Sequence, residues 1–208
     1  GGAINFVTRR PTDRFEGYVE LQGENPRGLR ANAAINIPLA AGLYQRFAAN
    51  YINRDGYTKN LLDGTMVDGR NQYTLRSSTR LEPTDTTTVD LTLTYFREDS
   101  DRQNAAKSLC TPDPTFGCSP NSVSAAFPTN NFTIDNFLLG GRVRAGTFAA
   151  NPKSLREVLI DVKPFQKAED FLATLEINQE LGSVTITSVT GLRDGSNSSE
   201  RDFDQGYR

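Results

Sequence analysis

Apolar and polar residues alternate along seven segments of the chain. In the first, residues 15–22, the odd positions are apolar or glycine and the even positions are polar or tyrosine. The same period of two recurs in the segments 30–37, 46–52, 72–81, 89–96, 171–178 and 184–187. Because successive side chains of a strand point to opposite faces, the pattern predicts seven β-strands, each with an apolar side and a polar side.

Two kinds of connection join these segments. Short turns rich in Pro, Gly or Asp, at 38–42, 83–86 and 181–183, close three hairpins. The connections at the opposite end are mostly longer, above all from about 99 to 168, although the first of them, 24–28, is short. Repeated alternation with short turns at one end and long loops at the other is typical of transmembrane β-barrels.

A soluble antiparallel β-sandwich would show the same alternation, with its apolar residues facing inward. The polar side mixes charges of both signs with Asn and Thr, and its charged members are Arg30, Arg46, Arg76, Arg80, Glu16, Glu20, Asp90 and Glu176. Such a side suits a watery barrel interior, and it suits open solvent equally well. Periodicity alone therefore leaves two all-β architectures open, a segment of an antiparallel transmembrane β-barrel and a β-sandwich.

The first eleven residues read Gly-Gly-Ala-Ile-Asn-Phe-Val-Thr-Arg-Arg-Pro. They resemble the end of the plug domain of TonB-dependent outer-membrane receptors, in which a globular plug fills a large β-barrel. The matching residues are Gly1, Gly2, Ala3, Ile4, Asn5, Val7 and Thr8. Further along, 39–57, 73–85 and 184–194 resemble strands and turns of the same family, in the same order.

This resemblance implies a domain organisation. Residues 1–11 would end a plug whose earlier part precedes Gly1 in the natural protein. Residues 12–208 would form the first part of the barrel, with seven strands of about 22 and a long extracellular loop at about 99–168.

The resemblance also implies a function. Receptors of this family bind a scarce nutrient, such as a ferric siderophore, cobalamin or a saccharide, at the outer face and pass it inward when TonB pulls on the plug. It implies an outer-membrane location in a Gram-negative bacterium, contact with outer-membrane lipid, and a TonB partner acting through residues before Gly1. It does not identify the ligand. The alternative is a secreted β-sandwich that serves as a binding or adhesion module.

The long loop of such a receptor would face an oxidising exterior. We therefore expect Cys110 and Cys118 to form a disulfide that closes a small ring; two free thiols in a reducing cell are the alternative. Without His or further Cys, the two thiolates cannot complete a structural zinc site. Four phenylalanines of the loop either contact the ligand or pack on one another and on the plug: Phe116, Phe127, Phe132 and Phe137.

One segment of this loop allows two interpretations. Ser154 and Glu157 have the spacing of a capping box and predict a short helix that Pro164 would end. Residues 158–162, in contrast, alternate as a strand does. The sequence leaves both structures open.

Composition argues against several other functions. The 23 basic and 25 acidic residues nearly cancel, so we expect no nucleic-acid partner. The chain has no histidine, the commonest general base and a favoured metal ligand, and no phosphate-binding glycine loop. Carboxylate pairs such as Glu98–Asp99 and Asp202–Asp204 would permit a hydrolase, yet they lie where solvated acids are the default. We therefore expect no enzyme activity, no cofactor and no metal site.

Mean hydropathy has different implications for helical membrane proteins and for β-barrels. The value of −0.50 and the absence of a long apolar run exclude a membrane protein built from helices. A β-barrel is compatible with it, because every second residue of a barrel strand faces the interior and only half of each strand must be apolar.

Overall fold

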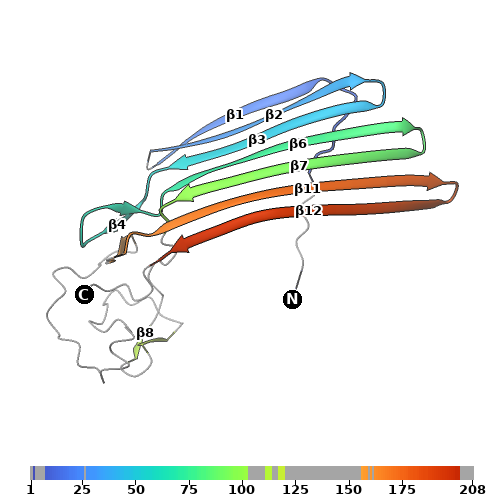
Figure 1. Cartoon of the computed structure of the whole chain (residues 1–208). Helices are drawn as coiled ribbons and strands as arrows, with labels where there is room; N and C mark the ends of the chain where they lie inside the picture. The colour runs from blue at the N-terminus through green and yellow to red at the C-terminus, as the bar shows by residue number, and fades with distance from the viewer. Residues whose placement is uncertain are drawn as a thin grey trace.

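The computed structural model describes residues 2, 8–25, 27–102, 111–113, 117–119, 156–158, 160 and 162–201. Its main feature is a seven-stranded sheet with the order β1-β2-β3-β6-β7-β11-β12 (Figure 1). The strands are β1 (Glu16–Glu24), β2 (Gly28–Ala40), β3 (Leu43–Arg54), β6 (Arg70–Thr84), β7 (Thr87–Ser100), β11 (Phe165–Leu181) and β12 (Val184–Glu200). All seven strands predicted from the alternation are confirmed, and each is longer than the segment that predicted it.

Every neighbouring pair in this sheet is antiparallel, and the register preserves the alternation from strand to strand. Ile35 lies opposite Phe47, which lies opposite Ser77, which in turn lies opposite Leu93. Since directly opposed residues share a face, such pairs form rows that cross the sheet. One complete row consists of Gly17, Ile35, Phe47, Ser77, Leu93, Ala173 and Leu192.

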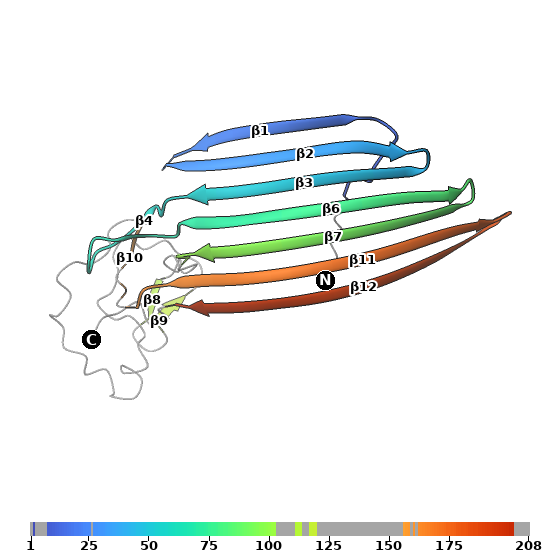
Figure 2. The same cartoon turned by 45° about the horizontal axis from the view of Figure 1, so that its top comes forward.

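Three short turns lie together at one end of the sheet, where the sequence predicts them (Figure 2). They join β2 to β3, β6 to β7 and β11 to β12. Gly42 in the first turn and Gly182 in the third have positive φ, of 72° and 65°. At Gly42 a side chain would also meet the Glu82 carbonyl oxygen at 2.7 Å, so glycine is required there for space as well as for conformation.

The opposite end of the sheet carries the longer connections and a second, smaller sheet. Its strands are β4 (Thr58–Asn60), β5 (Met66–Val67) and β10 (Glu157–Val158), in the order β10-β4-β5. Val67, Val158 and Ile160 pack together as a small buried core. In the long loop, β8 (Thr111–Asp113) and β9 (Gly117–Ser119) pair with each other.

The structure distinguishes the two interpretations of residues 154–164 where it describes them. Glu157 and Val158 are extended and pair in parallel with Lys59 and Asn60. The strand interpretation of residues 158–162 is confirmed at Val158, and the helix interpretation is wrong at Glu157 and Val158. Capping-box spacing alone does not make a helix form. Here the pairing with β4 determines the extended backbone conformation.

The seven strands form a single layer. Among the described residues no second sheet or helix covers the main sheet, and it is not closed, because β1 and β12 lie at opposite edges. The buried aliphatic residues that the structure describes, proline aside, are Ala34, Val67, Val158 and Ile160, and three of these belong to the small core at the loop end. None of the described segments is a helix long and apolar enough to cross a membrane.

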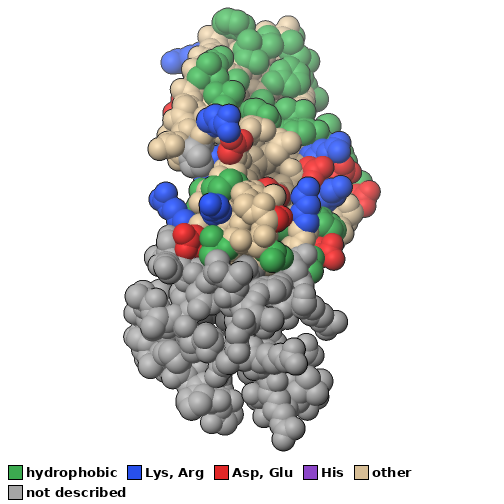
Figure 3. All heavy atoms as spheres, turned by 90° about the vertical axis from the view of Figure 1, so that its left-hand side faces the viewer, with side chains coloured by type: hydrophobic (Ala, Val, Ile, Leu, Met, Phe, Trp, Pro, Cys, Tyr) green, Lys and Arg blue, Asp and Glu red, His purple; other side chains and the backbone are tan. Residues whose placement is uncertain are grey.

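The two faces of this layer differ in chemistry. On the first, the apolar face, Val19 is 75% exposed and Leu192 is 63% exposed, and large aliphatic and aromatic side chains continue across all seven strands. Figure 3, which views the molecule from the loop end, shows hydrophobic side chains gathered toward the top and charges of both signs below them. The second, the polar face, buries Asn36 and Arg46.

Candidate functional site

The polar face is crossed by residues 8–14, here called the N-terminal segment. Asn36 on β2 holds this segment where it approaches β1: its Oδ1 accepts the Thr12 N–H at 3.0 Å, and its Nδ2 donates to the Thr12 carbonyl oxygen at 2.9 Å and to the Arg14 carbonyl oxygen. Asn36 is fully buried and Pro11 is also buried. A buried amide that satisfies three backbone groups fixes the path of the chain at this point.

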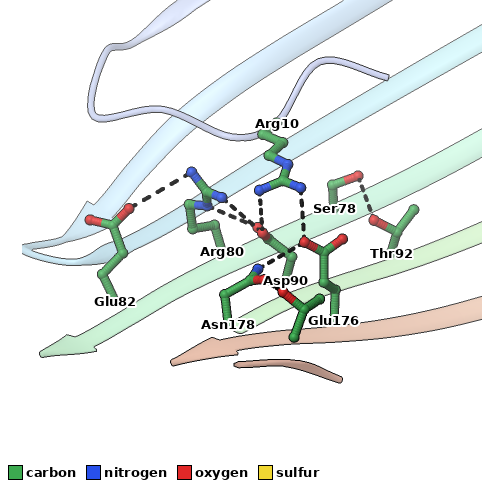
Figure 4. A network of polar contacts seen from close by, with 9 residues as sticks. Arg10, Ser78, Arg80, Glu82, Asp90, Thr92, Glu176 and Asn178 are labelled. Carbon is green, nitrogen blue, oxygen red and sulfur yellow. Dashed lines mark hydrogen bonds and ion pairs between the residues drawn. The ribbon is translucent and has the colours of Figure 1, made fainter. Parts of the chain in front are cut away.

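Further across the face, the N-terminal segment is held by charge. The Arg10 guanidinium lies 3.3 Å from Asp90 Oδ2 on β7 and donates to Glu176 Oε1 on β11 at 2.9 Å (Figure 4). Arg80 on β6 donates to both oxygens of Asp90, at 2.9 and 2.8 Å. The segment that precedes the first strand is thus connected to strands β7 and β11, far along the sheet.

These ion pairs differ in burial. The side chains of Asp90 and Arg80 are 12% and 18% exposed, whereas that of Arg10 is 48% exposed. The Arg80–Asp90 ion pair is bidentate, and it is therefore stronger than the contacts of Arg10. Solvent screens the contacts of Arg10, so we assign them about 1 kcal/mol or less.

A large hollow of about 940 Å³ lies at the loop end, between the ends of β3, β6, β7 and β11. Basic and acidic side chains both line it, among them Arg54, Arg70, Lys163, Asp99 and Asp101. Its charges are mixed, so the described residues do not select a ligand of one sign. A hollow of this size is in the range of small-molecule sites.

Side-chain contacts stabilise the walls of this loop-end hollow. Arg54 lies 4.9 Å from the centre of the Tyr57 ring and donates to the Asp68 carbonyl oxygen at 3.2 Å. Asp101 Oδ1 accepts the Gly69 N–H at 2.6 Å. The chain therefore returns from the β4–β5 hairpin to β6 along a defined path.

The far end of the long loop is tied to the same region. The buried Asn60 donates from Nδ2 to the Ile160 carbonyl oxygen at 2.9 Å and accepts the Ile160 N–H at 3.2 Å. In the nearby turn, Thr65 donates from its hydroxyl and its N–H to Asp63 Oδ1, and these bonds hold the pKa of the Asp63 carboxyl below its usual value. At a pH above the usual carboxyl pKa these bonds stabilise the turn fully. Their contribution is lost as the pH falls through the lowered pKa.

The structure describes few of the site residues expected from the sequence. Of the plug-end motif it describes Gly2 and Thr8, which is exposed; Gly1, Ala3, Ile4, Asn5 and Val7 lie outside the described residues. Cys110 and the side chain of Cys118 also lie outside them, so the disulfide stays a prediction. The same holds for Phe116, Phe127, Phe132 and Phe137.

Sequence reasoning placed Arg80, Asp90 and Glu176 on the polar face but missed their partner Arg10 and the role of Asn36. The period of two identified the face. No sequence signal identifies which residue of a distant segment lies over it. Among the described residues there is no group of three or more acidic, Cys or His side chains able to hold a metal ion.

Comparison of the chain with family models, with curated proteins and with solved structures gives no match. The geometry of the sheet and of its two faces is therefore the only guide to function.

Proposed function

We propose that the chain forms part of the wall of a plugged β-barrel receptor in the outer membrane of a Gram-negative bacterium. In this proposal the receptor takes up a scarce nutrient, such as a ferric siderophore, by TonB-energised transport. The observation that carries the proposal is the contrast between the faces: one is apolar and uncovered, and the other is polar and crossed by the segment that precedes the first strand.

The apolar face has the height that a bilayer requires. On β6 its side chains run from Tyr73 through Leu75 to Leu81, about nine residues, which matches the 9–11 residues of a tilted transmembrane strand. Aromatic residues gather near its loop end, where Tyr73 lies opposite Tyr51 and 6.0 Å from Tyr95, ring centre to ring centre. Barrels of outer membranes carry such aromatic girdles at the membrane–water interface.

Charges begin on this face in the same row as Tyr51 and Tyr73, where Arg97 lies opposite Tyr73. Arg97 and Glu169 form an ion pair at 3.4 Å between side chains that are about half exposed, and Asp99 lies opposite Lys167 in the next row. An apolar band that gives way first to a row of tyrosines and charges, and then to a charged row, is expected on passing from hydrocarbon through headgroups to water. In the proposal the loop end therefore faces the exterior.

The polar face would then line the lumen, with the N-terminal segment as the last part of the plug. Seven strands make up about a third of a 22-stranded barrel. The two free edges, β1 and β12, would pair with the remaining strands, which also satisfies their unpaired backbone groups. The loop-end hollow would open to the outside, where a ligand arrives.

The proposal is tested on the natural protein with its own flanking sequence, expressed in a Gram-negative host. We expect it in the outer-membrane fraction, extracted only by detergent, and migrating faster on a gel before heating than after. A protein that is monodisperse without detergent would contradict the proposal and favour the secreted β-sandwich.

Transport needs a second measurement. Uptake of labelled iron from ferric siderophores, of labelled cobalamin and of labelled oligosaccharides is compared in cells with and without the protein, and in cells without TonB. We expect uptake of one ligand class to require both. An outer-membrane protein for which no ligand depends on TonB would refute the transport function while leaving the barrel intact.

A further inference from the structure

A second hollow lies on the polar face, between the N-terminal segment and the sheet. Its volume is about 570 Å³. The polar side chains that line it are those of Thr8, Arg9, Tyr18, Arg46, Arg76 and Ser78. The first two come from the segment and the rest from β1, β3 and β6, so the hollow exists only while the segment lies on the sheet.

This hollow, unlike the loop-end one, carries charge of one sign. Three arginines, and no carboxylate, are among the described residues that line it. The side chain of Arg46 is only 10% exposed, and its ion pair with Glu16 is 3.8 Å long, beyond hydrogen-bond distance. Residues 1–8 of the sequence also contain no acid that could supply the missing charge.

Arg76 is half-buried and donates from Nε to Thr94 Oγ1 at 3.2 Å. Within the described part of the chain, neither Arg76 nor Arg9 forms an ion pair. Elsewhere on the same face Arg80 and Arg10 are neutralised by Asp90 and Glu176. Arg9 is exposed, but Arg46 and Arg76 are partly or largely withdrawn from water. Clustered cations in such a position are unfavourable unless an anion accompanies them.

We propose that this hollow, here called the arginine pocket, binds a small multivalent oxyanion such as a phosphate-bearing molecule. The guanidinium groups present paired N–H donors that match the oxygens of phosphate or carboxylate, and the hydroxyls of Thr8 and Ser78 add further donors. The volume suits a small molecule. Because Arg9 belongs to the N-terminal segment and Arg46 and Arg76 belong to the sheet, a bound anion strengthens the attachment of the segment.

The proposal does not depend on membrane insertion or on transport, since it requires only that the segment lie on the polar face. Either proposal can therefore fail its test without the other failing. The probe is inorganic phosphate, added to the purified full-length protein at constant ionic strength set with sodium chloride, and binding is followed by broadening of the ³¹P resonance.

Two substitutions address the pocket, and one matched substitution lies outside it. Arg76→Gln and Arg46→Gln each remove one guanidinium; Arg193→Gln removes a guanidinium from β12 on the same face, where Arg193 pairs with Asp170 at 2.7 Å. We expect each pocket substitution to weaken phosphate binding about tenfold or more, as the loss of a charge-assisted hydrogen bond does. Arg193→Gln leaves binding unchanged.

A second readout follows attachment of the segment. Phosphate slows tryptic cleavage after Arg14 in the wild type and has little effect in Arg76→Gln. Far-UV circular dichroism confirms the sheet in each variant, and Arg76→Gln provides the comparison if Arg46→Gln does not fold. The proposal is overturned if the wild type does not bind phosphate, or if Arg76→Gln binds it as well as the wild type does.

Discussion

The two faces of the main sheet are made by the same strands, yet they invert the usual relation between polarity and burial. Val19 on the apolar face is 75% exposed, whereas Asn36 on the polar face, on the neighbouring strand, is fully buried. Ordinary soluble domains bury aliphatic side chains and expose amides. A contiguous apolar surface over all seven strands is unusual for a soluble monomer. The proposed contact of the apolar face with lipid would account for this contrast.

The largest effect is expected when an arginine is placed on each face in turn. Leu91 on β7 lies on the apolar face and is 38% exposed; Leu172 on the adjacent β11 lies on the polar face and is 40% exposed. We expect Leu91→Arg to destabilise the protein by about 2–4 kcal/mol, as charges near the bilayer midplane do in outer-membrane barrels. Leu172→Arg has a much smaller effect.

The measurement is the free energy of unfolding of the full-length protein in lipid vesicles, obtained by denaturant titration. Because the two leucines have nearly equal exposure, a sheet surrounded by water predicts equal effects. Equal destabilisation by Leu91→Arg and Leu172→Arg would remove the distinction between the faces.

A smaller effect is expected on the polar face, where Asn36 holds the N-terminal segment. Asn36→Ala leaves the Thr12 N–H and the carbonyl oxygens of Thr12 and Arg14 without their partner in a part-buried position. Loss of such bonds costs about 1–3 kcal/mol. We expect the N-terminal segment to detach more often and trypsin to cleave after Arg14 about 5- to 150-fold faster.

The control for this prediction is Asn32→Ala, on the same strand and face, where Asn32 contacts Glu20 and Asn50 but not the segment. It leaves the cleavage rate unchanged. Equal cleavage of the wild type and Asn36→Ala would show that Asn36 does not hold the segment.

The smallest predicted effect concerns ion pairs on the two faces. Arg10→Gln removes contacts that hold the segment to Asp90 and Glu176, whereas Glu169→Gln breaks an exposed ion pair with Arg97 on the other face. We expect about 1 kcal/mol or less from the first, seen as cleavage after Arg14 that is about fivefold faster at low salt.

Salt provides the check on that interpretation. At about 1 M sodium chloride exposed charges are screened within a few ångströms, so the difference between Arg10→Gln and the wild type should shrink. Glu169→Gln does not alter cleavage at either salt concentration. A difference that persists at high salt would mean that Arg10 acts through packing.

The fold was largely predictable, because each strand of the sheet has a period of two and glycine or proline marks most of its turns. Strand ends were not. The prediction ended the last strand at 187, but β12 continues to Glu200, since its backbone pairs with β11 up to Phe165 opposite Glu200 whatever the side chains are. Side-chain alternation detects the part of a strand that has one apolar side, and it weakens where both sides are polar.

The candidate site was predictable only in part. Polar alternation identified the face that carries Asp90 and Glu176, but the contact with Arg10 joins residues 166 positions apart. Similarly, alternation at 158–162 favoured a strand but did not identify its partner, and β10 pairs with β4 over only two residues on each strand. Contacts of this kind arise from the three-dimensional path of the chain, and local patterns do not encode them.

The central claim is that the apolar face meets lipid and the polar face does not. The direct measurement places a nitroxide label at position 91 or 172 of the full-length protein in lipid vesicles, in a background with Cys110 and Cys118 replaced by serine. Collision rates with oxygen, which concentrates in lipid, and with a water-soluble nickel chelate are then compared. We predict that oxygen dominates for Leu91→Cys and the nickel chelate for Leu172→Cys. Equal access of the nickel chelate to both labels would contradict the account.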